Sequence, residues 1–331
     1  MGVSLLAVRE VETGGDNECA GEMPDVKALP NRSKATSSDV SDAVETVLPD
    51  LIEIFTASDD VATFSPVNAE DEDAASQESD YLNHVVYEQN AGWFQLYTPR
   101  NRELAESLIK RAEASGAKAI VVTLDTWLTG WRPRDLNASN FPQLRGKVLQ
   151  NYFSDPVFRS LLDKPPEEDP KAAIMLFAAI FGQVLTWDDM AWFKSVTDLP
   201  IVLKGICHPD DVRLAKDHGA DAIYCSNHGG RQANGGIATI DLLPDVVAAA
   251  GDTPVLFDSG VRSGTDAVKA LAMGATAVGV GRPYTYGLAI GGAKGAAWVL
   301  RSILAEADLL MAVNGYPTLA DVRAAGVQRT D

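Results

Sequence analysis

A histidine and an arginine lie three residues apart in the glycine-rich stretch SNHGGR, residues 226–231. Free imidazole titrates near neutral pH, at about 6.5, so His228 is suited to removing a proton from a substrate. Arg231, on the same loop, can hold a carboxylate through parallel N–H bonds. A single histidine is more often structural than catalytic, but the position of His228 beside two glycines and an arginine favours a general base. Asp125 is the candidate carboxylate to strengthen that base.

Two further stretches carry the residue types of a phosphate site. Gly260 and Gly281 allow the backbone to approach a ligand closely, and Arg262 and Arg282 bring positive charge. The alternative is that both arginines lie at the surface and the glycines only serve turns. Lys204 ends the apolar run PIVLK, where its ammonium can stabilise negative charge on a reduced cofactor ring, unless it is merely exposed.

The elements that must position these residues are expected from residue 91 onward, where short apolar runs alternate with helical patterns. We expect strands over 93–97, 119–125, 200–204, 221–226, 254–258 and 276–281. Helices are expected over 102–115, 209–218, 240–250, 264–273 and 293–312. His208 and His218, at the two ends of one of these helices, are interpreted as structural. The alternation predicts an α/β fold, a (β/α)8 TIM-type barrel that is incomplete, with about six recognisable strands.

Every expected strand ends in polar or ionisable side chains. They are Gln95 and Tyr97, Thr123 and Asp125, Lys204, Ser226, Asp258 and Ser259, and Arg282. The carboxyl ends of parallel barrel strands meet at one face, which is where barrel active sites lie. An insertion over about 127–186 leaves from the same face, so we interpret it as a lid, with a loop for contacts between subunits as the alternative.

Charge divides the chain in two. Its 331 residues carry a net charge of −18, of which residues 1–90 hold 20 acidic and 4 basic residues, a net of −16. We therefore expect an acidic, irregular segment over 1–90 and the barrel over 91–331. Two barrel strands are missing from the pattern, and residues 1–90 contain no convincing candidates for them. The negative net charge argues against nucleic acid as a partner, because phosphate backbones repel an acidic protein.

The remaining composition limits the location and the cofactor. The three cysteines show no CxxC spacing, which argues against a disulfide framework and against a metal site. The apolar patch over 3–8 lacks a preceding basic region and is a poor signal peptide. No run approaches the roughly 20 apolar residues that span a bilayer, and the chain does not end in a peroxisomal tripeptide. We expect a cytoplasmic protein without a membrane partner.

Two stretches, SNHGGRQ at 226–232 and DSGVRSGTDAVKALAMGA at 258–275, resemble the FMN-dependent α-hydroxy acid oxidizing enzymes. More narrowly, VVTLDTWLTGWRPRDL at 121–136, YCSNHGGRQANGG at 224–236 and GRPYTYG at 281–287 resemble lactate 2-monooxygenases. The resemblance covers about 240 residues, from 91 to the end of the chain. A different phosphate-binding barrel enzyme is the alternative that SNHGGRQ argues against.

The resemblance implies a role for each matching residue. FMN is the implied cofactor, with Lys204 beside its ring, Gln95 and Thr123 as ring contacts, and Arg132 and Arg231 on the substrate carboxylate. Tyr97 lies near the substrate hydroxyl, and His228 and Asp125 form the base. The residues that resemble the ribityl and phosphate cradle are Asp258, Ser259, Gly260, Arg262, Gly281 and Arg282, and Ser226 is a further cofactor-binding residue. Ser259 stands where a glycine is common elsewhere in the family, and its backbone amide could still donate to the cofactor.

The implied reaction is the oxidation of a small L-2-hydroxy acid, foremost L-lactate with O2 to acetate and CO2. An oxidase or dehydrogenase that yields the keto acid is one alternative, and a truncated, non-catalytic family member is another. The resemblance also implies a homo-oligomer.

Overall fold

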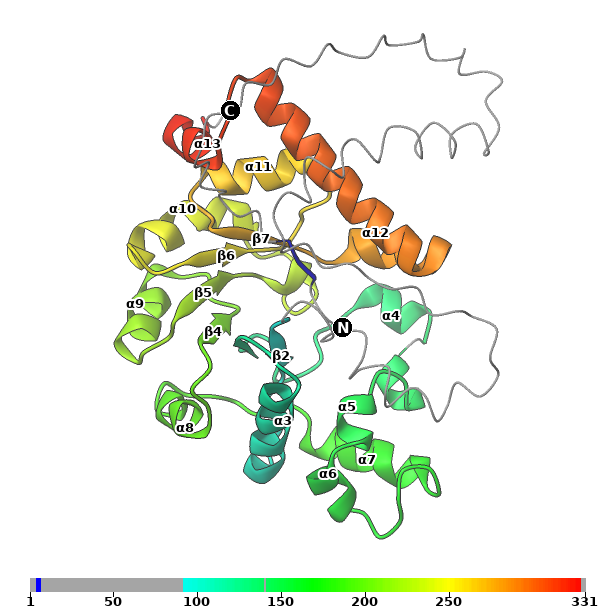
Figure 1. Cartoon of the computed structure of the whole chain (residues 1–331). Helices are drawn as coiled ribbons and strands as arrows, with labels where there is room; N and C mark the ends of the chain where they lie inside the picture. Colours follow the sequence, from blue (N-terminus) through cyan, green and yellow to red (C-terminus); the bar gives the residue numbers. More distant parts are fainter. Residues whose placement is uncertain (1–3, 7–91, 140, 329–331) are drawn as a thin grey trace, which may run out of the picture. The chain divides into compact units, whose positions relative to one another are not determined.

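The computed structural model describes residues 4–6, 92–139 and 141–328 (Figure 1). These residues fall in one compact unit, and a second unit, Arg9–Thr63, lies outside them. The acidic irregular segment expected over 1–90 therefore lies almost wholly outside the described residues. The same holds for the question of whether that segment completes a barrel.

A parallel sheet of six strands in chain order forms the centre of the fold. Its strands are β2 (Phe94–Leu96), β3 (Ile120–Thr123), β4 (Ile201–Lys204), β5 (Ala222–Cys225), β6 (Val255–Phe257) and β7 (Ala277–Val280). Each strand pairs with the next in parallel register, as in Val122 opposite Leu203. All six expected strands are present, each shorter than expected, and the prediction of an incomplete α/β barrel is confirmed.

A seventh strand was not expected. β1 (Ser4–Leu6) pairs antiparallel with β7, Ser4 opposite Val280 and Leu6 opposite Val278. The patch over 3–8 was interpreted only as a poor signal peptide, because a strand of three residues cannot be recognised without its partner. The sheet order is β1-β7-β6-β5-β4-β3-β2, so that β1 and β2 are its edges.

Two apolar layers lie on the two faces of the strands. Val121, Val202, Tyr224 and Leu256 belong to a small inner cluster. The alternate strand residues, such as Val122 and Leu203, belong to the larger cluster shared with the helices. Side chains alternate along a strand, so Thr123 and Lys204 face the same side as Val121 and Val202. The strand ends therefore aim their last polar side chains into the barrel.

Helices cover the other face of the sheet (Figure 1). They are α3 (Arg102–Ala114), α8 (Asp189–Val196), α9 (Pro209–Asp217), α10 (Thr239–Ala250) and α11 (Gly264–Ala272), while α12 (Arg282–Val313) and α13 (Leu319–Ala325) pack on α11. α3 begins where the Asn101 side chain accepts a hydrogen bond from Leu104 N. His208 accepts one from Asp210 N at the start of α9, and His218 ends the same helix, so both are structural as expected. α13 was not expected.

α12 begins eleven residues before its expected start at 293. The stretch 282–292, which contains Gly287, Gly291 and Gly292, was not assigned to a helix. The helix kinks at Gly291 and Gly292, and its two arms pack closely. A Cβ on Gly287 would lie 2.3 Å from the carbonyl oxygen of Gly295, so these glycines permit a helix crossing. No helix of the described residues, α12 included, is long and apolar enough to cross a membrane.

The insertion over 127–186 contains several short helices that the sequence analysis did not assign. They are α4 (Pro133–Asn137), the 3-10 helix η1 (Pro142–Arg145), α5 (Gln150–Phe153), α6 (Pro156–Ser160) and α7 (Pro170–Ile180). Asp155 ties them to α3. Its side chain is fully buried, caps α6 through Val157 N and Phe158 N, and pairs with Arg111 at 2.9 Å. The role of the insertion as a lid stays a prediction.

We expect Asp155→Ala to lower the free energy of unfolding by about 3 kcal/mol, because it removes a helix cap and charge-assisted hydrogen bonds together. Asp169→Ala removes only the cap of α7, a single hydrogen bond to Ala172 N, and should cost about 1 kcal/mol. Urea unfolding followed by circular dichroism measures both. Equal losses in the two variants would show that Asp155 does not anchor the insertion.

Candidate active site

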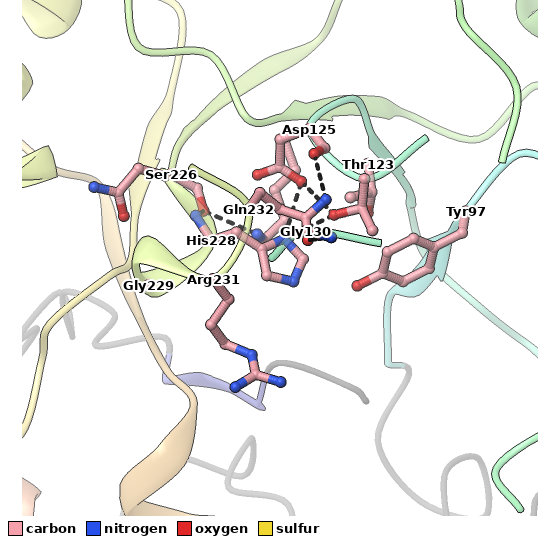
Figure 2. A network of polar contacts seen from close by, with 12 residues as sticks. Tyr97, Thr123, Asp125, Gly130, Ser226, His228, Gly229, Arg231 and Gln232 are labelled. Carbon is pink, nitrogen blue, oxygen red and sulfur yellow. Dashed lines mark hydrogen bonds and ion pairs between the residues drawn. The ribbon is translucent and has the colours of Figure 1, made fainter. Parts of the chain in front are cut away.

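Polar side chains from three parallel strands meet at the carboxyl end of the sheet. Tyr97 follows β2, Asp125 follows β3, and His228 and Arg231 follow β5. In Figure 2 the imidazole of His228 lies between Asp125 and Tyr97, and Arg231 extends from the same loop. We call residues 226–231 the His228 loop. This is the convergence that the polar strand ends predict.

The His228 ring is fixed by a carboxylate. Its Nδ1 lies 2.9 Å from Asp125 Oδ1, and both side chains are 16% exposed. Thr126, which the sequence analysis did not single out, donates to Asp125 Oδ1 at 2.9 Å and lies 3.1 Å from His228 Nδ1. The carboxylate assigns the proton to Nδ1, which leaves the lone pair on Nε2 free to accept another.

The environment of Asp125 keeps it ionised. Burial acts to raise the pKa of its carboxyl, but the hydrogen bond and charge of His228, the charge of Lys204 and the hydrogen bond from Thr126 lower it below the ordinary value. The second oxygen, Oδ2, is buried and has no hydrogen-bond partner among the described residues. Asp125 can therefore stabilise an imidazolium that forms when His228 takes up a proton.

Two arginines converge on one side of this pair. Arg231 Nη2 lies 3.3 Å from Asp135 Oδ2, and Arg132 Nη1 lies 4.0 Å from the same oxygen. The pKa of Arg132 is lowered by burial first and by the charge of Arg231 second. Two neighbouring guanidiniums on one carboxylate oxygen show that this corner favours an anion. Asp135 was missed because an acidic residue in a charged run gives no pattern of its own.

Gln232 joins the insertion to the His228 loop and was also missed. Its Nε2 donates to the carbonyl oxygens of Asp125 and Leu128, and its Oε1 accepts from Gly130 N and from Arg132 Nη2. Four hydrogen bonds from one amide hold the start of the insertion against the loop. Only its place in SNHGGRQ could have pointed to it, since a lone glutamine carries no specific chemistry.

Tyr97 and Gln95 complete the wall at the end of β2. The Tyr97 ring centroid lies 6.4 Å from that of His228, edge on. Gln95 Nε2 donates to Thr123 Oγ1 at 2.9 Å and to the Tyr97 hydroxyl at 3.3 Å. Burial, and then the charge of Asp125, raise the pKa of Tyr97 to about 12. Its hydroxyl is therefore protonated at neutral pH and can donate to a substrate oxygen.

Lys204 is the buried cation of the site. Its side chain is 1% exposed, and its Nζ donates to Ser226 Oγ at 2.9 Å and lies 3.4 Å from Asp258 Oδ2. The alternative of an exposed lysine at a strand end is therefore excluded. An ammonium at this position, with Thr123 opposite it on β3 and Gln95 bonded to Thr123 from β2, fits the electron-rich edge of a cofactor ring.

The arginines on the loops after β6 and β7 make fewer hydrogen bonds to the site than the residues described above. Arg262 and Arg282 are both exposed, as the surface alternative expected. Arg282 Nη2 donates to Gly229 O at 2.9 Å, whereas no side-chain bond of Arg262 connects it to the site within the described residues. A Cβ on Gly260 or Gly281 would meet no atom within 4 Å, so both backbones are accessible to a phosphate. This arrangement fits the expected cradle.

A family model described as FMN-dependent dehydrogenase matches residues 73–329. The chain belongs to this family. Its membership makes FMN the expected cofactor, and the buried Lys204 and the accessible glycines fit it. A second family model, Phage SU10 portal protein, matches residues 14–100, far less than half of the chain and mostly outside the described residues.

Two curated proteins with names are similar to the chain over more than two thirds of its length. The FMN-dependent alpha-hydroxy acid dehydrogenase qulF of Penicillium citrinum is 44% identical over 250 residues, 73% of this chain and 62% of its own. An L-lactate oxidase of Lysinibacillus sphaericus is 42% identical over 240 residues, 72% and 62% of the two chains. Among solved structures, an active chimera of (S)-mandelate dehydrogenase matches with a TM-score of 0.63 at 34% identity, covering 73% and 66%. The chain thus spans about three fifths of the length of these curated relatives.

We expect Asp125→Asn to weaken the decrease in the free energy of unfolding that acidic pH causes. Since the folded pKa of Asp125 is lowered, its contribution is present above the ordinary value of about 3.9 and is lost as pH falls through the folded value. The variant lacks this contribution, so its free energy of unfolding should fall less than that of the wild type below about pH 4. Urea unfolding between about pH 3 and 6 measures it. The exposed Asp252, changed to Asn, controls for the lost charge, and parallel wild-type and Asp125→Asn profiles would contradict the coupling.

Proposed function

We propose that this protein catalyses the FMN-dependent oxidation of a small L-2-hydroxy acid. The observation that carries the proposal is the His228–Asp125 pair, at 2.9 Å, flanked by Arg132 and Arg231 on one side and Tyr97 on the other. A 2-hydroxy acid has a carboxylate, a hydroxyl and a hydrogen on the carbon between them. The arginines, the tyrosine and the base provide one partner for each.

The roles follow from the groups and their surroundings. Arg132 and Arg231 hold the substrate carboxylate, since both already lie within reach of a shared anion at Asp135. His228 Nε2 accepts the α-proton, or the hydroxyl proton if the α-hydrogen leaves as hydride. Asp125 stabilises the imidazolium that results. The protonated Tyr97 hydroxyl donates to the substrate hydroxyl oxygen.

The chemistry that bound FMN would supply is an acceptor for the electron pair of the substrate. Lys204, Gln95 and Thr123 would hold its ring, and Lys204 would stabilise the negative charge that the ring gains. The rest of the cofactor would lie on Ser226, Asp258, Ser259, Gly260, Arg262, Gly281 and Arg282. The exposed arginines and open glycines at the ends of β6 and β7 support the phosphate end of this placement.

For the substrate we propose L-lactate, converted with O2 to acetate, CO2 and water. The stretch VVTLDTWLTGWRPRDL at 121–136 supports this outcome, together with the folded insertion that begins beside Gln232. A closed insertion would keep pyruvate at the site while oxygen reacts. Release of pyruvate and hydrogen peroxide is the second candidate, favoured by relatives named L-lactate oxidase. Assembly into a homo-oligomer and a cytoplasmic location stay predictions.

We expect His228→Gln to lower the rate of anaerobic flavin reduction by L-lactate about 10²- to 10⁴-fold, because the general base is lost. FMN binding should persist, since the phosphate and ring contacts remain. Stopped-flow absorbance of the bound flavin measures the rate. His208→Gln, at an exposed helix cap, is the matched control. An undiminished rate in His228→Gln would remove His228 from the mechanism.

Product analysis separates the candidate reactions. With L-lactate and air, we expect acetate and CO2 in equal amounts, with little free peroxide. Pyruvate with an equal amount of peroxide would establish the oxidase instead. A purified chain that stays colourless after incubation with FMN would support the non-catalytic family member and contradict both enzymes.

A further inference from the structure

Ser259 adopts a backbone conformation that serine rarely accepts. Its φ is +84°, in the left-handed region where glycine is the favoured residue. Such a conformation costs a residue with a side chain some free energy and persists where surrounding contacts hold it. A contact made by the side chain itself therefore has to account for a serine at this position.

The Ser259 hydroxyl makes three hydrogen bonds. It donates to Asp258 Oδ1 at 2.8 Å, and it accepts from Asn227 N at 3.2 Å and from Gly229 N at 3.0 Å. A hydroxyl has one donor and two acceptor lone pairs, so its capacity is used in full. The two amides that it binds belong to the residues directly before and directly after His228.

The His228 loop needs such support. His228 itself has a φ of +57°, and Gly229 and Gly230 follow at +65° and +70°. The only regular structure assigned to this loop is the short 3-10 helix η2 (His228–Gly230), inside which Gly229 departs from helical φ and ψ. The amide of His228 is bound by Ser226 Oγ at 3.1 Å, so two serine hydroxyls bind three successive amides.

Both serines are fixed to the same buried ion pair. Lys204 Nζ donates to Ser226 Oγ at 2.9 Å and lies 3.4 Å from Asp258 Oδ2, while Asp258 Oδ1 accepts from Ser259. The ends of β4, β5 and β6 are thereby connected to the backbone on either side of His228. The orientation of the imidazole depends on this connection and on Asp125 from the other side.

We propose that Ser259 is a positioning residue for His228. Its hydroxyl holds the backbone of the His228 loop so that the imidazole meets Asp125 and the substrate, a role separate from any contact with the cofactor. The proposal rests on the function proposed above, in which His228 is the base. Small displacements of a catalytic group cost large factors in rate, so loss of this support should reduce turnover.

The test compares Ser259→Ala with Ser259→Gly in the FMN-loaded protein. Alanine removes the hydroxyl and keeps the strained conformation, whereas glycine removes the hydroxyl and the strain together. Amide hydrogen exchange at Asn227 and Gly229, followed by NMR, should quicken about tenfold or more in both variants. With L-lactate, kcat should fall about tenfold in both, with KM within about twofold of the wild type. The FMN dissociation constant should also stay within about twofold, because the expected cofactor contact of Ser259 is its backbone amide, which both variants keep. Ser263→Ala, on the same loop but at the cap of α11, should leave exchange at both amides unchanged.

The outcomes separate the possible failures. Unchanged exchange at both amides would overturn the proposal, and weakened FMN binding with unchanged exchange would assign the hydroxyl to the cofactor. Wild-type kcat in Ser259→Gly would show that the hydroxyl does not position the base. If the wild type does not oxidise 2-hydroxy acids, the proposed function fails, and the exchange data alone then decide whether Ser259 holds the loop.

Discussion

The hydrogen bond between His228 and Asp125 is the contact on which the chemistry of the site depends. The two residues follow β5 and β3, which are not neighbours, because β4 lies between them. The bond is possible only because parallel strands bring their carboxyl ends to one face of the sheet. Lys204 stands at the end of β4, the strand between them, as a buried cation paired with Asp258. The order of the parallel strands thus brings the catalytic side chains together, and the loops fix their orientations.

The charges of the site are arranged in compensated pairs. Lys204 pairs with Asp258, His228 with Asp125, and the two arginines with Asp135. A buried ion without a partner would cost several kcal/mol, about 3 or more, so these contacts lower the cost of placing Lys204, Asp125 and the arginines in a partly buried site, while His228 Nε2 remains available to accept a proton. An anionic substrate enters a site in which the basic partners are already oriented. The acidity of the whole chain, by contrast, resides in residues outside this region.

The sequence predicts the six parallel strands because each is a short apolar run between breakers, and it predicts the converging residues because polar side chains end those runs. It does not predict Thr126, Asp135 or Gln232. Their importance comes from distances between segments about 100 residues apart, as in the contact of Thr126 with His228. The start of α12 was placed too late for a related reason. Gly287 allows two helix arms to cross, and a glycine in a sequence does not reveal what approaches it.

The antiparallel strand β1 has a consequence for how the sheet can close. Each edge of a strand offers one row of N–H and C=O groups, and β1 occupies the outer row of β7. In a (β/α)8 barrel that row belongs to a parallel neighbour. A parallel strand and β1 therefore cannot pair with this edge of β7 at the same time. A strand that closed the barrel at β7 would have to displace Ser4–Leu6 from that edge. The three-residue strand therefore covers backbone groups that would otherwise be free to pair with another chain.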